Sequence, residues 1–175
     1  MEKKFGNCTV KLKKGDISNH PDADAIVNAA NAQLRIGGGV AGAIHRIGDP
    51  ELEELTRPLA PISPGEAVIT GAPNLPNEYV IHCLGPVYGR DNPADTLLAN
   101  CYRNALKLAN EHEAEVIAFP AISTGAFGYP MRAAAEIAFK TIQETAPGLT
   151  NVQSIHFVLF SQEALSLHKE VLQDL

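Results

Sequence analysis

Short runs of β-branched and aromatic residues alternate along this chain with longer segments in which apolar residues recur every three or four positions. The short runs predict strands over residues 8–12, 25–28, 67–70, 79–84, 116–120 and 155–160. The periodic segments predict helices over residues 93–112, 130–145 and 162–172, and a further helix that begins near Val40. This alternation predicts an α/β fold, a three-layer α/β/α sandwich with a mixed sheet whose central strands are parallel. In such folds, ligands bind at the carboxyl ends of the strands.

The composition is that of one soluble globular domain that extends over residues 1–175. Hydrophobic residues make up 45% of the chain and charged residues 19%, and no apolar run approaches the roughly 20 residues of a membrane-spanning helix. Residues 1–5 lack the apolar core of a secretory signal, so we expect a cytoplasmic protein with no membrane partner. Cys8, Cys83 and Cys101 are widely spaced, which favours reduced, buried thiols over disulfides or a zinc site. We expect neither a cofactor nor a metal.

The net charge of the chain argues against binding of nucleic acid but permits binding of a small phosphorylated ligand. A net charge of -6 opposes binding along a nucleic-acid backbone, where many phosphates must be neutralised. A small phosphorylated ligand is compatible with this charge, because backbone N–H groups and helix N-termini hold phosphate without lysine or arginine. We therefore expect no nucleic-acid partner.

The clearest candidate for a phosphate site follows the second predicted strand. There the chain continues through Asn28-Ala29-Ala30-Asn31 to Gly37-Gly38-Gly39-Val40 and the predicted helix. Three consecutive glycines carry no side chains and permit positive φ, so successive N–H groups can face an anion. The start of the helix adds free N–H groups and the positive end of the helix dipole. Taken alone, the same segment also fits an ordinary flexible turn.

A second loop of similar character, Ser123-Thr124-Gly125-Ala126-Phe127-Gly128, lies between the predicted strand at residues 116–120 and the helix at residues 130–145. Two such loops at one edge of a sheet could grip a diphosphate, with one further group of the ligand on each flank. That description fits a nucleotide diphosphate linked to a sugar. Neither loop matches GxxxxGKS or GxGxxG, so a Walker-type NTPase and a dinucleotide-binding Rossmann unit are poor fits.

Several segments in the same order give nearly the whole chain a specific resemblance to the macrodomain family. They are Gly15-Asp16-Ile17, Val27-Asn28-Ala29-Ala30-Asn31, Gly37-Gly38-Gly39-Val40-Ala41-Gly42-Ala43-Ile44, His82-Cys83-Leu84-Gly85-Pro86 and Ser123-Thr124-Gly125-Ala126-Phe127-Gly128-Tyr129-Pro130. The resemblance implies a macrodomain-like sandwich that recognises ADP-ribose, either free or attached to a protein side chain. The implied partner is a mono-ADP-ribosylated protein.

The resemblance also implies a role for each matching residue. Asp16 would accept a hydrogen bond from the adenine amino group, the N–H of Ile17 would meet a ring nitrogen, and Phe160 would stack on the purine. Asn31 would bind the distal ribose, while Asn28 would brace the turn through its own side chain. The other ligand-binding positions would line the diphosphate and the distal ribose: Gly38, Gly39 and Val40 on one side, and Ser123, Thr124, Gly125, Ala126 and Phe127 on the other. The alternatives are a solvated turn residue for Asp16, a core residue for Phe160 and a loop anchor for Phe127.

The residue after Gly-Gly-Gly-Val bears on catalysis. In hydrolytic relatives of the MacroD type it is an aspartate thought to act on a water, whereas here it is Ala41, which cannot abstract a proton. His45 matches a histidine of the same relatives, and viral macrodomains with a similar alanine-containing stretch are hydrolases. The resemblance thus implies hydrolysis of mono-ADP-ribosyl esters or O-acetyl-ADP-ribose, with Asn31 and His45 as catalytic residues. Asn31 and the substrate phosphate would hold the attacking water. The alternatives are a non-catalytic ADP-ribose reader and, for His45, a surface or packing residue.

Overall fold

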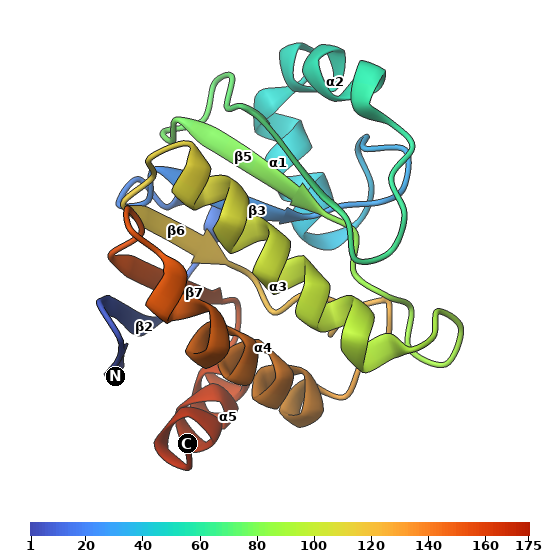
Figure 1. Ribbon diagram of the computed structural model, residues 1–175. Coiled ribbons are helices and arrows are strands. Elements are labelled where there is room, and N and C mark those ends of the chain that lie inside the picture. The colour runs from blue at the N-terminus through green and yellow to red at the C-terminus, as the bar shows by residue number, and fades with distance from the viewer.

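A seven-stranded mixed sheet forms the middle layer of the protein (Figure 1). The structure is a computed structural model that describes residues 1–175. The strands lie in the order β1-β2-β7-β6-β3-β5-β4. The inner strands pair in parallel, while β1 and β4 pair antiparallel with their neighbours at the two edges. The strands are β1 (Glu2–Phe5), β2 (Cys8–Lys14), β3 (Ala25–Ala29), β4 (Ala67–Gly71), β5 (Tyr79–Cys83), β6 (Val116–Phe119) and β7 (Ser154–Leu159). The predicted mixed sheet with a parallel centre is confirmed.

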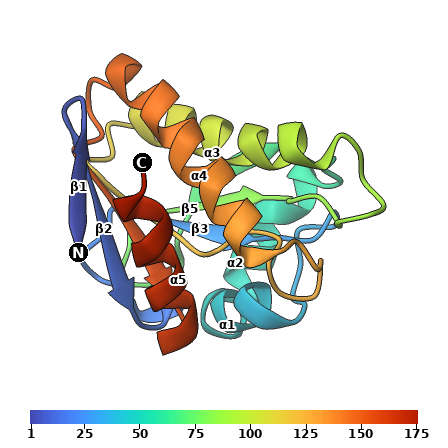
Figure 2. The ribbon, with the colours of Figure 1, turned by 90° about the horizontal axis from the view of Figure 1, so that it is seen from below.

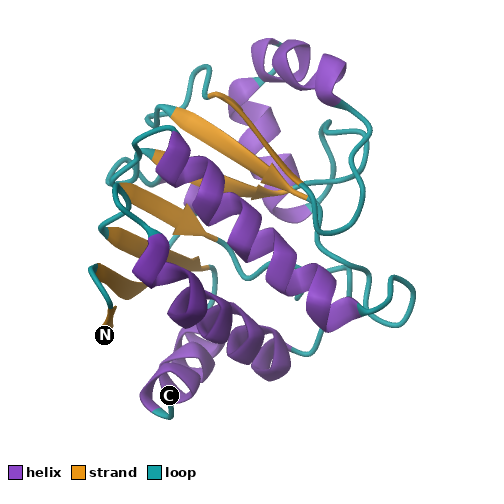
Figure 3. Ribbon diagram, in the orientation of Figure 1, coloured by secondary structure: helices purple, strands orange, loops and turns teal.

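Helices cover both faces of this sheet and complete the three predicted layers (Figure 2). On one face lie α3 (Ala94–Glu111), α4 (Met131–Thr145) and α5 (Gln162–Gln173). On the other face lie α1 (Gly39–Gly48) and α2 (Glu51–Thr56). Three short 3-10 helices, η1 (Ile17–Asn19), η2 (Arg57–Leu59) and η3 (Ala146–Gly148), lie in the connections. Figure 3 shows the strands of the sheet between the helices of the two faces.

The alternation of side chains in β3 shows why its first three residues are all apolar. Ala25 and Val27 belong to the core beneath α3, α4 and α5, whereas Ile26 packs with Ile44 of α1 and Leu52 of α2. A strand covered by helices on both faces buries every side chain, so its sequence reads as a continuous apolar run.

Two short elements, β1 and α2, are additional to the predicted set. In the six-residue α2, Leu52 is the buried apolar residue, and Glu51, Glu53 and Glu54 lie in its first turn. One buried apolar residue in so short a segment does not repeat every three or four positions, so the sequence gives no helical pattern. Where the sequence predicted helix starts at residues 93 and 130, Pro93 and Pro130 are N-caps just outside α3 and α4.

The three cysteines are free and buried. Burial raises the pKa of the Cys101 thiol to about 12, so it stays protonated and unreactive at neutral pH. None of the helices combines the length and the apolar character required to cross a bilayer.

Candidate functional site

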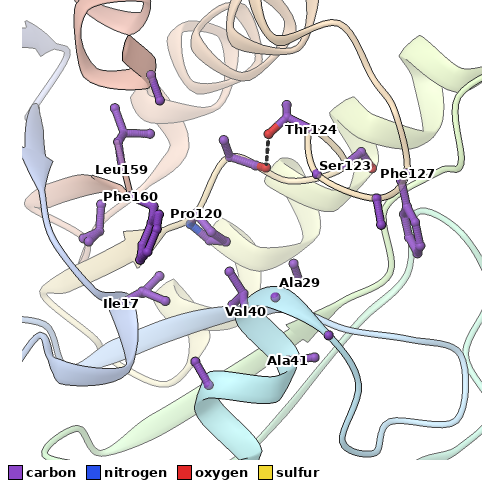
Figure 4. A pocket seen from close by; sticks show the side chains of 18 of the residues that line it. Ile17, Ala29, Val40, Ala41, Pro120, Ser123, Thr124, Phe127, Leu159 and Phe160 are labelled. Carbon is purple, nitrogen blue, oxygen red and sulfur yellow. Dashed lines mark hydrogen bonds between the residues drawn. The ribbon is translucent and has the colours of Figure 1, made fainter. Parts of the chain in front are cut away.

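A cavity of about 790 Å³ opens where four parallel strands end (Figure 4). Its lining comes from the ends of β3 and β7, from the segments that follow β2, β3, β6 and β7, and from α1, α4 and α5. This is the location expected for a ligand site in an open α/β sheet. Each ligand-binding residue implied by the resemblance lines the cavity: Asp16, Ile17, Asn31, Gly38, Gly39, Val40, Ser123, Thr124, Gly125, Ala126, Phe127 and Phe160. The structure thus brings them together, while their contacts with a ligand remain predictions.

The glycine loop, residues 37–39, presents the N-terminus of α1 to the cavity. Gly38 is the N-cap, and no side chain caps the helix, so the first N–H groups are available to an acceptor in the cavity. Gly39 has a φ of 55°, a left-handed conformation that glycine adopts without strain. The arrangement suits an anion, because unpaired N–H groups and the positive end of the helix dipole face the same space.

Gly42 holds this loop against α1, a role that the sequence analysis did not assign. A Cβ at position 42 would lie 2.5 Å from the carbonyl oxygen of Gly37 and 3.0 Å from Nη1 of Arg46. Real Cβ atoms essentially never approach a backbone oxygen so closely, so the curvature of the loop depends on glycine at this position. The only signal in the sequence was the row of small residues at the start of the predicted helix.

The second loop, residues 121–128, follows β6 and faces the glycine loop across the cavity. Ser123 has a φ of 67°, and its buried Oγ has no hydrogen-bond partner. The loop is fixed from within, since the Tyr129 N–H donates to the Ser123 carbonyl at 2.9 Å and the Thr124 hydroxyl donates to the Ala121 carbonyl at 2.8 Å. A Cβ at Gly85 would collide with the Ser123 Oγ, so this glycine also sets the position of the loop.

One end of the cavity carries a carboxylate, that of Asp16, and an exposed aromatic ring, that of Phe160. Asp16 Oδ1 accepts hydrogen bonds from the Ser18 N–H at 2.9 Å and the Ser18 hydroxyl at 2.6 Å, which leaves Oδ2 for another donor. Phe160 is 88% exposed, so the core alternative for this residue is wrong. Figure 4 shows Phe160 close to Ile17 at this end of the cavity, while Phe127 lies at the opposite end.

Phe127 lies at the other end of the cavity and packs on the cluster with Leu34, whose N–H donates to the Asn31 carbonyl, so Asn31 lies at this end too. The Asn31 amide donates to the Arg35 carbonyl at 2.7 Å and accepts from the Arg35 N–H at 3.2 Å, which fixes its orientation. An amide group has a second hydrogen and a second lone pair, so Asn31 keeps one donor and one acceptor for a sugar. Phe127 lines the cavity and also packs on a small cluster that includes Leu34 and Leu84, so it is both a cavity residue and a loop anchor.

Asn28 does not brace a turn, which corrects the role expected for it. It lies inside β3, and its amide nitrogen is 3.1 Å from Nδ1 of His82 on the neighbouring strand β5. His82 Nε2 in turn is 3.0 Å from the hydroxyl of Thr70, which donates to the Gly71 carbonyl. Burial, with His45 nearby, lowers the pKa of His82 to about 3, so the ring is neutral and accepts from Asn28 at Nδ1. This chain of bonds ties three strands together beneath α1.

His45 is fully buried and does not line the cavity. Its Nδ1 is 2.8 Å from Oδ1 of Asp49, and its Nε2 has no partner. The structure therefore does not bring His45 together with Asn31, and the packing alternative accounts for its burial. Any influence of His45 on a ligand must pass through the residues above it on α1, such as Ala41, which does line the cavity. The catalytic role expected for His45 remains a prediction.

Two charged side chains line the cavity, Asp16 and Arg46. Sequence reasoning missed Arg46, although it lies one helical turn after Gly42. On an α-helix, residues four apart share a face, so an arginine here belongs to the same side of α1 as the contact between Gly37 and Gly42.

Comparisons with known proteins agree with this geometry. The family model described as Macro domain matches residues 27–138 of this chain. A macro domain-containing protein of Chlorobaculum tepidum is 46% identical over 167 residues, which are 95% of this chain and 96% of that protein. A protein of Citrobacter rodentium named O-acetyl-ADP-ribose deacetylase is 45% identical over 172 residues, with 95% of this chain and 96% of that protein covered.

Two solved structures show the same likeness in three dimensions. The macrodomain of Oceanobacillus iheyensis with ADP has a TM-score of 0.93 and 38% identity, and the match covers 99% of this chain and 95% of that one. The macrodomain of Trypanosoma brucei in complex with ADP-ribose has a TM-score of 0.83 and 33% identity, with 93% of this chain and 68% of that one covered.

Proposed function

Because this chain belongs to the macrodomain family, we propose that its cavity binds ADP-ribose, either free or attached to a protein in the cytoplasm. The observation that carries the proposal is the convergence of the two loops, at residues 37–39 and 121–128, on one cavity of about 790 Å³. A cavity of this size is typical of small-molecule sites. The complexes of related macrodomains with ADP and ADP-ribose support the same ligand.

The two ends of the cavity differ in chemistry, and this difference sets the orientation of the bound ligand. Adenine stacks on Phe160 and donates its amino group to Asp16, because this end offers an exposed aromatic face beside a carboxylate. The diphosphate lies between the two loops, where it accepts from backbone N–H groups at the start of α1. The distal ribose lies beside Asn31 and Phe127 at the opposite end.

We expect Asp16→Asn to change which purine the protein prefers. An asparagine keeps the acceptor that caps η1 through Ser18, but its amide hydrogen would face the adenine amino group. Affinity for ADP-ribose should fall by about tenfold, since a hydrogen bond to a charged group is worth about 1.5–3 kcal/mol. Inosine diphosphate ribose presents an oxygen in place of that amino group and should bind the variant better than it binds the wild type. Calorimetry with both ligands measures the reversal.

The matched variant Asp16→Ala removes both the acceptor and the cap. It should weaken ADP-ribose binding and abolish discrimination between the two purines without reversing it. Unchanged affinity for ADP-ribose in both variants would show that the purine does not lie beside Asp16.

We further propose that the protein hydrolyses acyl esters of ADP-ribose. The substrate is either ADP-ribose attached to an acidic protein side chain or O-acetyl-ADP-ribose. The name of the Citrobacter rodentium relative supports an activity of this kind. Asn31 and a phosphate oxygen of the substrate hold a water beside C1″ of a protein ester. The water oxygen bonds to C1″ as the bond from C1″ to the carboxylate oxygen breaks, the carboxylate leaves as an anion, and the water proton passes to the phosphate.

Release of ADP-ribose from a protein automodified on acidic side chains tests this reaction. We expect turnover by the wild type and a rate at least about tenfold lower for Asn31→Ala, because the water loses its positioning group. Ala41→Asp should raise the rate by about tenfold or more, since it adds a carboxylate to the cavity lining next to the glycine loop. The exposed Lys107→Ser, on α3 and outside the cavity lining, is the control and should match the wild type.

A non-catalytic reader is the second candidate, and Ala41 is the observation that favours it. The alanine lines the cavity at the position where hydrolytic relatives place an acid, and its methyl group neither orients nor deprotonates a water. No release by the wild type over hours, with ADP-ribose binding intact, would establish the reader.

A further inference from the structure

Arg46 is a cation without a counter-ion at the edge of the cavity. Its exposed guanidinium makes no hydrogen bond and no ion pair, in contrast to Arg90 and Arg132, which pair with acidic side chains. The nearest acidic residue along the helix, Asp49, is engaged by His45 Nδ1 and by the Glu53 N–H. The charge of Arg46 is therefore free for a ligand.

The guanidinium lies beside the glycine loop. Its Nη1 is 3.0 Å from where a Cβ on Gly42 would be, and that same point is 2.5 Å from the Gly37 carbonyl oxygen. Long side chains on a helix lean toward the N-terminus, so the Arg46 side chain runs back along α1 toward Gly38 and Gly39. A rotation about its own side-chain bonds would carry the guanidinium over the mouth of the loop.

The two loops by themselves do not balance the charge of a diphosphate. They contribute neutral N–H groups and the partial positive charge of about half a unit at the start of α1. The segment from residue 120 to residue 131 contains no charged residue, and Asp16, the other charged side chain of the cavity, is negative. Arg46 is thus the one full positive charge in the lining.

We propose that Arg46 closes over the diphosphate from the solvent side and selects diphosphate ligands over nucleosides. This inference rests on the proposed function, because it requires the diphosphate to lie between the two loops. A guanidinium offers several donors in a planar fork, which matches the oxygens of a phosphate. The exposed position means that the contact forms in a high dielectric, so its contribution is modest.

The test compares the wild type with Arg46→Gln, which keeps a polar, hydrogen-bonding side chain but is shorter and carries no charge. Calorimetry at low salt should show ADP-ribose binding about five- to tenfold weaker in the variant, while adenosine, which has no phosphate, binds both proteins equally. The wild-type affinity for ADP-ribose should also fall more steeply with added salt than the affinity of the variant does, because the lost interaction is ionic. Arg46→Lys should restore most of the affinity.

Any other result overturns either the role of Arg46 or the proposed function. Equal affinity of Arg46→Gln and wild type for ADP-ribose, or an equal loss for adenosine, would overturn the role of Arg46 while leaving ADP-ribose binding intact. A loss seen only with an ADP-ribosylated protein would also overturn it and would place Arg46 against the protein part of the substrate. Failure of the wild type to bind ADP-ribose would instead overturn the proposed function. Lys107→Gln, on α3 and outside the cavity lining, controls for the loss of one positive charge.

Discussion

Gly38→Glu is expected to abolish ADP-ribose binding without unfolding the protein. The backbone at Gly38 has a φ of -85°, and a Cβ there would meet no heavy atom within 4 Å, so a side chain fits without strain. Because Gly38 lines the cavity, the new carboxylate would lie beside the proposed diphosphate. Two like charges at about 4 Å repel by about 4 kcal/mol at an effective dielectric constant near 20, so affinity should fall at least about a hundredfold. Calorimetry with ADP-ribose gives the loss directly.

The matched control is Gly38→Ala, which adds only a methyl group in the same open space. It should keep affinity within a few-fold of the wild type, and thermal unfolding should show both variants as stable as the parent. A Gly38→Glu protein that binds ADP-ribose normally would show that the diphosphate lies elsewhere.

Gly42→Ala should damage both the glycine loop and the stability of the protein. In an ordinary helix interior this substitution stabilises by about 1 kcal/mol, because alanine restricts the unfolded chain. Here the new Cβ would lie 2.5 Å from the Gly37 carbonyl oxygen, so the loop must move away from α1. We expect a loss of about 1–3 kcal/mol in the free energy of unfolding, as for other overpacked sites, and at least tenfold weaker ADP-ribose binding.

Gly71→Ala provides the comparison for this second variant. Position 71 ends β4, its backbone does not require positive φ, and a Cβ there would contact nothing within 4 Å. Denaturant unfolding and calorimetry should therefore find Gly71→Ala close to the wild type in both stability and affinity. A stabilised Gly42→Ala protein with normal affinity would contradict the close approach of Gly37 to α1.

The apolar pattern predicted most of the architecture because long, regular elements leave a repeating signal. The helix predicted over residues 93–112 is α3 (Ala94–Glu111), and the strand predicted over residues 25–28 is β3 (Ala25–Ala29). The pattern did not reveal α2, where one buried leucine stands among acidic residues. Strand order also lies outside local sequence, since β2 pairs with β7 from the far end of the chain.

The ordered motifs located the residues that line the cavity. They could not distinguish a residue that lines the cavity from a buried residue that lies beneath it. Asn28 and Asn31 belong to one short motif, yet Asn28 bonds to His82 inside the sheet while Asn31 reaches the cavity. His45 and Arg46 are adjacent in the chain, and the helix turns the first into the interior and the second toward the cavity. The first distinction follows from the pairing of β3 with β5, and the second follows from the packing of α1 on the sheet.

The sequence by itself determined the fold class, the two glycine-containing loops and the family, because these depend on the order and spacing of residues along one chain. The tertiary structure alone decided that Gly42 must be a glycine, that Phe160 is exposed and that Arg46 has no acidic partner. The first depends on how the loop at residues 37–39 folds back on α1, and the other two depend on exposure and neighbours in the folded protein. The local pattern of residues carries none of this, since distances and exposure are set only when the chain has folded.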